Sequence, residues 1–296
     1  MRRSFDAQTV FSAKGSMVSD ADGETRSASR TVSRFVTDVP RGKPCAVVLV
    51  THGLNLHPDR MLPVCEVLRG LGAIVVRMAL RGHQGRYEDL VTVTRNAWLD
   101  DFRDACERIG RIRSESPQHA SLPVAFVGQS IGALTFTDYL LQPERAAMFV
   151  GALFLSPAIA LRPKAQVMRV ARIAPRRLPI PSASATEDRM YDRLPAGAYR
   201  ALFDAYSAVR HSLREHPMRL PTTILCDPND ELVSVKGLRR LIDSERLPNA
   251  RLVTIESSDD ARGYGHMAVD EPTMGPANWE KCREHLIRLM EGVRRS

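Results

Sequence analysis

Six short runs of apolar residues, rich in β-branched side chains, recur along the chain and predict strands buried on both faces. They lie at residues 45–50, 73–80, 123–127, 149–155, 222–226 and 250–255. Segments with apolar residues at helical spacing lie between or after these runs, at about 59–69, 96–112, 131–140, 196–214, 235–242 and from 278 onward. Strands that alternate with helices across long connections predict an α/β protein with a mostly parallel sheet covered by helices on both faces.

Two segments fall outside this alternation. Residues 1–43 are polar, with a weak alternation over 31–37, and we expect either an edge hairpin or a partly disordered head. Residues 161–220 are rich in proline and arginine and hold one clear helix, so we interpret them as an inserted helical lid. The α/β core is then expected to comprise residues 44–160 and 221–296.

Residues 128–132, with the sequence GQSIG, join a predicted strand directly to a predicted helix. A tight turn at this place forces the backbone of Ser130 into a strained conformation, and the flanking glycines remove side chains that would clash between strand and helix. The hydroxyl of Ser130 then projects from the end of the strand, close to the positive end of the following helix. Ser130 is therefore a candidate nucleophile.

A candidate acid and a candidate base follow later strands. Ligands collect at the carboxyl ends of parallel strands, so the loops there are the ones that bear chemistry. The loop after the fifth predicted strand holds Asp227, Asp230 and Glu231, and the loop after the sixth holds His266. Serine, aspartate and histidine thus occur in the chain order of a sheet-borne hydrolase triad. We expect Glu231 and the acidic pair at 259–260 to be solvated loop charges.

Five short motifs are spread from about residue 46 to the C-terminus. They are Thr51-His52-Gly53-Leu54, Arg81-Gly82-His83-Gln84-Gly85, residues 128–132, Asp230-Glu231-Leu232-Val233 and Gly265-His266. Together they resemble the serine hydrolases of the α/β-hydrolase fold, most nearly the esterases of the lysophospholipase and monoacylglycerol-lipase type. The resemblance implies that fold for the core, and it covers neither residues 1–43 nor residues 161–220.

The resemblance also implies a catalytic triad. Ser130 would attack an acyl carbonyl, His266 would take its proton and return it to the leaving alkoxide, and Asp230 would orient the imidazole. Asp230 is preferred to Asp227 because it stands three residues before Val233, as in the acid-x-x-Val pattern of the family.

For the oxyanion hole, the resemblance implies the backbone N–H groups of Leu54 and Ile131. The expected supporting residues are His52, Gly53, Gly128 and Gly132. We interpret His52 and His83 as structural hydrogen-bonding residues rather than bases. In this chain Ala79 stands where the family often has aspartate, which leaves open what braces the loop around His83.

Positive charge is concentrated in the proposed lid. The chain has a net charge of +8, and residues 161–220 hold twelve Lys or Arg against five Asp or Glu. We interpret the cationic series from 162 to 177 as the solvated face of a lid helix whose apolar side covers the pocket. Contact with an anionic membrane surface or an acidic substrate is the open alternative. Nucleic-acid binding would explain the charge but not the triad, so no nucleic-acid partner is expected.

Other classes of protein fit the sequence less well. The five scattered cysteines lack C-x-x-C spacing and predict buried thiols. Neither an H-E-x-x-H motif nor a Gly-rich phosphate loop occurs, so we expect no metal and no other cofactor. No apolar run approaches the roughly 18 residues of a membrane span, and the N-terminus lacks the apolar run of a signal peptide, so we expect a cytoplasmic protein.

The sequence therefore predicts a serine hydrolase that cleaves carboxylic (acyl) esters, of monoacylglycerol or lysolipid type, through an acyl-enzyme on Ser130. A thioesterase or an acyltransferase would use the same triad, and both alternatives stay open. A non-catalytic lipid-binding module is a further alternative, because a fold alone does not fix a function. The substrate would be a small acyl ester, whose chain length and alcohol the sequence does not indicate. Nor does it indicate an oligomeric state.

Overall fold

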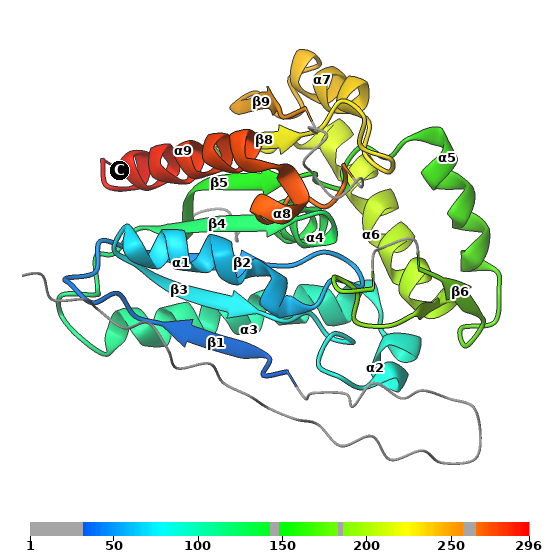
Figure 1. The fold of residues 1–296 in the computed structure, drawn as a ribbon, viewed down its shortest axis with the longest axis horizontal. Helices are drawn as coiled ribbons and strands as arrows, with labels where there is room; N and C mark the ends of the chain where they lie inside the picture. Colours follow the sequence, from blue (N-terminus) through cyan, green and yellow to red (C-terminus); the bar gives the residue numbers. More distant parts are fainter. Residues whose placement is uncertain (1–31, 143–147, 183–185, 257–264, 296) are drawn as a thin grey trace, which may run out of the picture.

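A seven-stranded sheet forms the centre of the protein in a computed structural model that describes residues 32–142, 148–182, 186–256 and 265–295. Its strands are ordered β1-β3-β2-β4-β5-β8-β9 (Figure 1). Their bounds are β1 Phe35–Asp38, β2 Ala46–Thr51, β3 Ala73–Met78, β4 Val124–Gln129, β5 Phe149–Leu155, β8 Thr222–Cys226 and β9 Ala250–Thr254. Within the described part of this sheet, β1 pairs with β3 antiparallel and all the other neighbouring strands pair in parallel. The mostly parallel sheet predicted from the sequence is confirmed.

Helices cover both faces of this sheet, and successive strand residues enter different layers. On β2, Val47 and Leu49 pack into one core and Val48 and Val50 into the other, and all four are fully buried. The first layer contains α3 (Arg95–Ser114), α4 (Ile131–Leu140) and α6 (Ala196–Glu215), and the second contains α1 (Leu62–Gly70) and α9 (Pro276–Val293). Burial on both faces explains why the strands appear in the sequence as continuous apolar runs.

Residues 161–220, called the insertion below, lie between β5 and β8 in the chain. They form α5 (Pro163–Gln166), a 3-10 segment η3 (Val167–Arg172), the hairpin β6 (Pro179–Pro181) and β7 (Arg193–Pro195), and α6. Figure 1 shows these elements beside the carboxyl ends of β4, β5 and β8. The helix expected over 196–214 is α6, whereas the basic stretch forms only short helical turns between Pro163 and Pro175.

The remaining elements connect these layers. They are η1 (Pro58–Met61), α2 (Tyr87–Thr92), α7 (Val235–Asp243) and α8 (Glu271–Met274). The edge strand β1 takes β3 as its partner. The hairpin or disordered head expected for residues 1–43 stays a prediction, because residues 1–31 lie outside the described part of the chain.

Candidate active site

Ser130 occupies the sharp turn between β4 and α4, with φ 48° and ψ −111°. A positive φ at a residue other than glycine is strained and persists only where the surroundings enforce it. At Gly132 an added Cβ would lie 2.7 Å from the carbonyl oxygen of His52, and at Gly128 it would lie 2.5 Å from the ring of Phe126. The two glycines therefore allow the close packing that holds Ser130 in this turn.

The side chains of Ser130, His266 and Asp230 form one chain of hydrogen bonds. The Ser130 hydroxyl lies 2.8 Å from Nε2 of His266, and Nδ1 of His266 lies 2.9 Å from Oδ2 of Asp230. All three side chains are buried, with 6%, 5% and 0% of the residue exposed, respectively. With the proton on Nδ1, the imidazole donates to Asp230 and can accept the serine proton at Nε2.

Asp230 is held in its ionised form by its neighbours. Burial acts to raise the pKa of Asp230. The opposite effect is larger: the charge and hydrogen bond of His266, and then the N–H groups of Val233 and Leu232, lower the pKa below 3.8. Those N–H groups donate to Oδ1 at 2.7 and 2.8 Å. Asp227, the alternative acid, accepts instead from a backbone N–H in its own turn at 2.6 Å.

The loop after β2 brings Leu54 to the edge of the site. Leu54 lines the same cavity as Ser130 and His266. The loop lies against the strand–helix turn so closely that a Cβ on Gly53 would overlap the side-chain oxygen of Gln129 and come within 3.3 Å of Cβ of Ser130. Ile131 begins α4, where the first N–H groups lack an acceptor within the helix. The two predicted oxyanion donors thus flank the nucleophile on separate segments.

His52 and His83 are buried and act as hydrogen-bonding partners of the backbone. Nδ1 of His52 lies 2.7 Å from the carbonyl oxygen of Gly53, and Nε2 of His52 accepts from the N–H of Leu80 at 3.1 Å. Nε2 of His83 accepts from the N–H of Asn55 at 3.0 Å. Burial lowers the pKa of His83 to about 4, and burial followed by the proximity of His83 lowers the pKa of His52 well below 6.5. Both rings are neutral at pH 7, as a structural role requires.

Asp101 braces the loop in which Ala79 replaces the aspartate often found in the family. From α3, its carboxylate accepts from the backbone N–H of Arg81 at 2.8 Å and pairs with the guanidinium groups of Arg81 and Arg34 at 2.9 and 2.5 Å. The indole of Trp98 donates to the carbonyl oxygen of Arg81 at 3.1 Å. The bracing that the sequence left open therefore comes from α3, and sequence reasoning missed Asp101.

Glu231 does not have the solvated position expected for it. Its carboxylate accepts from the backbone N–H groups of Gly265 and His266, both at 3.2 Å. The expectation of a loop charge in solvent was wrong, since these hydrogen bonds hold the carboxylate. The sequence did not indicate them because both partners lie more than thirty positions away. The pair at 259–260, for which the same was expected, lies outside the described residues.

An apolar cavity of about 250 Å³ opens over Ser130 and His266. Its walls come mainly from the insertion, through Ala165, Met168, Leu194, Tyr199, Leu202 and Phe203. Burial raises the pKa of Tyr199, in keeping with a largely apolar interior. Such a cavity, with a few polar groups at one end, suits a small ligand with an apolar chain.

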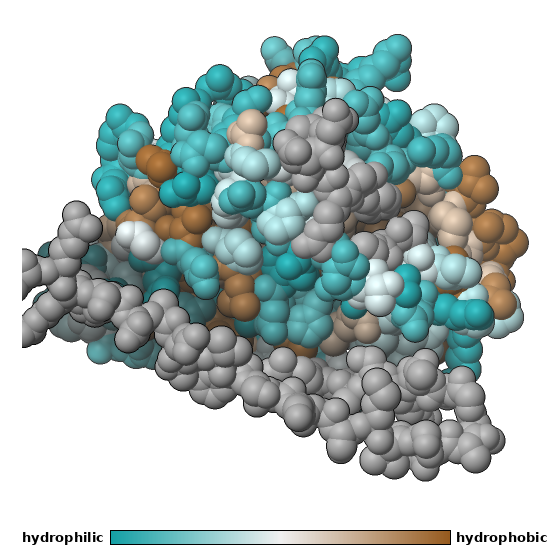
Figure 2. Space-filling model, in the orientation of Figure 1, coloured by the Kyte–Doolittle hydropathy of each residue, from teal (hydrophilic) through white to brown (hydrophobic). Residues whose placement is uncertain are grey.

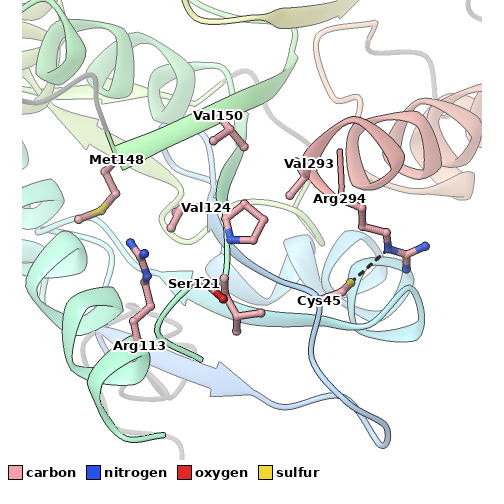
Figure 3. Close-up of a pocket in the computed structure, with 10 residues that line it drawn as sticks. Cys45, Arg113, Ser121, Val124, Met148, Val150, Val293 and Arg294 are labelled. Carbon is pink, nitrogen blue, oxygen red and sulfur yellow. Dashed lines mark hydrogen bonds between the residues drawn. The ribbon is translucent and has the colours of Figure 1, made fainter. Parts of the chain in front are cut away.

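A second cavity, of about 520 Å³, lies at the other end of the sheet, before β2 and β4 begin (Figure 3). Arg113 and Arg294 line it, but their guanidinium groups donate to the backbone carbonyls of Ala120 and Leu71, each at 2.6 Å. Arg294 also contacts Sγ of Cys45 at 3.4 Å. None of the candidate catalytic side chains reaches this cavity, so the smaller one is the candidate active site.

Within the described ranges, no group of three or more His, Cys, Asp or Glu side chains is arranged to hold a metal ion. Of the five cysteines, Cys65, Cys226 and Cys282 are buried, and Cys45 and Cys106 are half-buried. The expectation that no metal and no other cofactor takes part stays a prediction.

Comparison with known proteins gives relatives for both the sequence and the fold. The model of the family described as serine aminopeptidase, S33, a hydrolase family, matches residues 42–189. Mouse monoglyceride lipase is 25% identical over 239 residues, which cover 74% of this chain and 76% of the mouse protein. Human monoglyceride lipase is 28% identical over 126 residues, which cover 42% of this chain and 39% of the human protein.

Solved structures share the architecture. A soluble variant of monoglyceride lipase from Saccharomyces cerevisiae superposes with a TM-score of 0.70 at 13% identity, over 86% of this chain and 90% of the yeast chain. The monoacylglycerol lipase of Paleococcus ferrophilus gives a TM-score of 0.66 at 17% identity, over 88% of this chain and all of the other. The predicted α/β-hydrolase fold is confirmed.

Proposed function

The chain belongs to the hydrolase family described as serine aminopeptidase, S33, and from this membership and the geometry of the site we propose that it cleaves carboxylic esters of monoacylglycerol type through an acyl-enzyme on Ser130. The observation that carries the proposal is the 2.8 Å contact between Ser130 Oγ and His266 Nε2 at the floor of an apolar cavity. A nucleophile paired with a base, which is itself oriented by an acid, has the geometry required for acyl transfer.

In the proposed reaction, Ser130 Oγ attacks the ester carbonyl carbon while Nε2 of His266 takes the hydroxyl proton. The carbonyl oxygen becomes an anion, stabilised by the N–H groups of Leu54 and Ile131. Collapse of this intermediate breaks the ester C–O bond, and His266 protonates the departing alkoxide. Water then attacks the acyl-enzyme with the same assistance and releases the acid. Asp230, ionised because its pKa is lowered, stabilises the imidazolium in both halves.

Two observations support an uncharged acyl ester as substrate. The cavity walls are apolar, as an acyl chain requires, and the relatives at 25% and 28% identity are named monoglyceride lipases. Among the lining residues that the structure describes, none carries a carboxylate that would bind the ammonium group of an aminopeptidase substrate.

Labelling with a fluorophosphonate probe tests the proposal. The protein should be labelled and should hydrolyse p-nitrophenyl esters, and the Ser130→Ala variant should lose both properties. Esters of about two to about sixteen carbons would then define the acyl length, since apolar burial grows with each methylene. Matched thioesters and a second alcohol acceptor distinguish a thioesterase and an acyltransferase, and absence of labelling in the intact protein would favour a non-catalytic lipid-binding module.

We further propose that the insertion acts as the lid of this site. The insertion supplies most of the cavity wall, and its residues bind the loop that carries Leu54. Leu56 forms a β-bridge with Arg189, and Arg60 pairs with Asp188 at 2.8 Å. These contacts join the lid to the segment that bears an oxyanion donor.

The outer surface of the lid supports contact with a membrane. Val167, Val170 and Ile173 are 70%, 62% and 85% exposed. Figure 2 shows hydrophobic side chains gathered at the right edge of the molecule, where Figure 1 places α5. These three apolar residues of the basic stretch therefore face solvent, and the expectation that they cover the pocket was wrong, whereas Met168 of the same stretch lines the cavity. Exposed apolar groups beside cations are typical of surfaces that lie in a lipid interface.

Only part of the positive charge of the lid is available to lipid headgroups. Arg172 pairs with Asp204 at 2.7 Å and Arg177 with Glu88 at 2.8 Å. We therefore propose a peripheral contact driven mainly by apolar insertion, with anionic lipid as a weaker contribution. No helix in the described part of the chain is both long and apolar enough to span a bilayer. The cytoplasmic location stays a prediction.

A further inference from the structure

Two side chains bind the backbone of His266, one at its N–H group and the other at its carbonyl oxygen. Oε2 of Glu231 accepts from the N–H of His266 and Oε1 accepts from the N–H of Gly265, both at 3.2 Å. The side-chain amide of Gln129 donates to the carbonyl oxygen of His266 at 3.0 Å. Glu231 directly follows Asp230 and Gln129 directly precedes Ser130 in the chain. The neighbours of the acid and of the nucleophile thus both bind the histidine between them.

The position of His266 depends on such contacts because no regular element carries it. The connection from β9, which ends at Thr254, to α8, which begins at Glu271, contains the histidine. The hydrogen bond to Asp230 orients the ring but does not itself hold the backbone, whose carbonyl oxygen also accepts from the N–H of Ala268 at 3.2 Å. Misplacement of a catalytic group by about 1 Å can cost on the order of a hundredfold in rate.

Glu231 and Gln129 differ in what else they contact. Gln129 lines the cavity and packs against Gly53, so its substitution would also change substrate binding and the position of the loop that carries Leu54. Glu231 is not among the residues lining the cavity. Its two hydrogen bonds are assisted by its charge and go to consecutive backbone N–H groups, which fixes the direction of the chain at His266. Glu231 therefore allows the effect of backbone anchoring to be measured separately.

We propose that Glu231 is a positioning residue for the hydrolysis, which acts by fixing the backbone of His266, and that Gln129 completes the anchor at the carbonyl oxygen. This inference rests on the proposed function, in which His266 is the base. It assigns Glu231 no contact with substrate and no proton transfer. Its loss should therefore slow the chemical step without weakening substrate binding.

The test compares Glu231→Ala and Glu231→Gln with Glu107→Gln, which removes the same charge at an exposed position on α3 that does not line the cavity. Hydrolysis of a short soluble ester gives kcat and KM, and fluorophosphonate labelling gives the reactivity of Ser130 without substrate release. For Glu231→Ala we expect kcat and the labelling rate to fall about ten- to a hundredfold, with KM within about twofold. Glu231→Gln keeps one acceptor oxygen and should recover part of the loss, and Glu107→Gln should match the parent.

The outcomes separate this inference from the proposed function. An unlabelled and inactive parent protein would refute the proposed function itself. An active parent with an equally active Glu231→Ala variant, or a loss carried entirely by KM, would refute the role of Glu231. Thermal unfolding of each variant identifies the folded fraction to which rates are normalised. If Glu231→Ala does not fold, the isosteric Glu231→Gln variant decides, since normal kcat there contradicts the proposal.

Discussion

The side-chain amide of Asn55 pairs with the backbone of Tyr191 through two hydrogen bonds. Oδ1 of Asn55 accepts from the N–H of Tyr191 at 2.9 Å, and Nδ2 donates to its carbonyl oxygen at 2.8 Å. Nδ2 also donates to the hydroxyl of Ser182 at 2.9 Å. Asn55 directly follows Leu54 and has φ 59°, a left-handed conformation that asparagine tolerates better than most residues. One side chain thus couples the insertion to the loop that carries Leu54.

Removal of this link should impair both substrate binding and turnover. Asn55→Ala loses the hydrogen bonds and the favourable left-handed residue, whereas Asn55→Gly loses only the hydrogen bonds. We expect KM for long-chain esters to rise and kcat to fall, each severalfold, with Ala worse than Gly. Steady-state kinetics check this, with Asn249→Ala as control because the side chain of Asn249 binds the exposed carbonyl of Arg219 far from the site. Unchanged kcat and KM in Asn55→Ala would show that the insertion and the loop that carries Leu54 act independently.

The stability of the protein should decrease in acid because of His83. Its folded-state pKa of about 4 lies below the ordinary value of 6.5, so between these values the unfolded chain binds more protons. The free energy of unfolding should therefore fall as the pH drops through this window, by up to about 3 kcal/mol from this residue. His83→Gln keeps an acceptor for the N–H of Asn55 but does not titrate.

Urea unfolding between about pH 4.5 and about pH 7.5 measures this effect. The parent should lose stability on acidification more steeply than His83→Gln. The pKa of His52 is lowered first by burial, which both proteins share, and then by His83, which the variant lacks. The loss of this second effect also makes the variant less sensitive to acid, so it acts in the same direction as the loss of the His83 titration. Parallel stability curves would contradict the burial of a neutral imidazole at position 83.

Two glycine-to-alanine changes should have opposite effects on stability. At Gly132 the new Cβ meets the backbone carbonyl oxygens of His52 and Thr51 at 2.7 and 2.9 Å. We expect the free energy of unfolding to fall by about 1–3 kcal/mol, and most of the fluorophosphonate labelling of Ser130 to be lost. Gly110 on α3 has no atom within 4 Å of the new Cβ, so alanine there should stabilise the helix by about 0.5–1 kcal/mol. Thermal and urea unfolding check both, and a neutral Gly132→Ala would contradict the close packing at the turn.

Vesicle binding should depend on the exposed apolar residues of the lid. A Val170→Ser, Ile173→Ser double variant should bind vesicles about tenfold more weakly, because two apolar side chains no longer enter the interface. Ile287→Ser on α9, where the side chain is also exposed, is the control. Sedimentation with zwitterionic and anionic vesicles across a salt series measures the apolar and electrostatic parts. Equal binding by the double variant and the parent would exclude this surface.

Asp230 and Glu231, which are adjacent in the chain, show which part of the site can be predicted from the sequence and which part cannot. Asp230 could be selected because its spacing to Val233 is local and characteristic of a family. The role of Glu231 depends on N–H groups of a loop that the fold brings near from a distant part of the chain. A carboxylate in a polar loop carries no sequence signal for such a partner, so solvent was the natural expectation.

The same contrast between local signals and tertiary contacts applies to the rest of the fold and site. The strands were predictable because burial on both faces leaves continuous apolar runs, and the turn at Ser130 because its glycines are local. Asp101 replaces a missing aspartate from another element, which only tertiary structure reveals. Apolar residues of the basic stretch, such as Ile173, were assigned to the pocket because periodicity gives a face but not what the face contacts.

Trapping the acyl-enzyme shows whether Ser130 is the nucleophile. The protein is mixed with an excess of a p-nitrophenyl ester, quenched in acid during turnover, digested and examined by mass spectrometry. The mass of one acyl group should appear on the peptide containing Ser130, and Ser130→Ala should show neither the adduct nor turnover. Turnover that persists in Ser130→Ala, or an adduct confined to another residue, would contradict the assignment of Ser130 as the nucleophile.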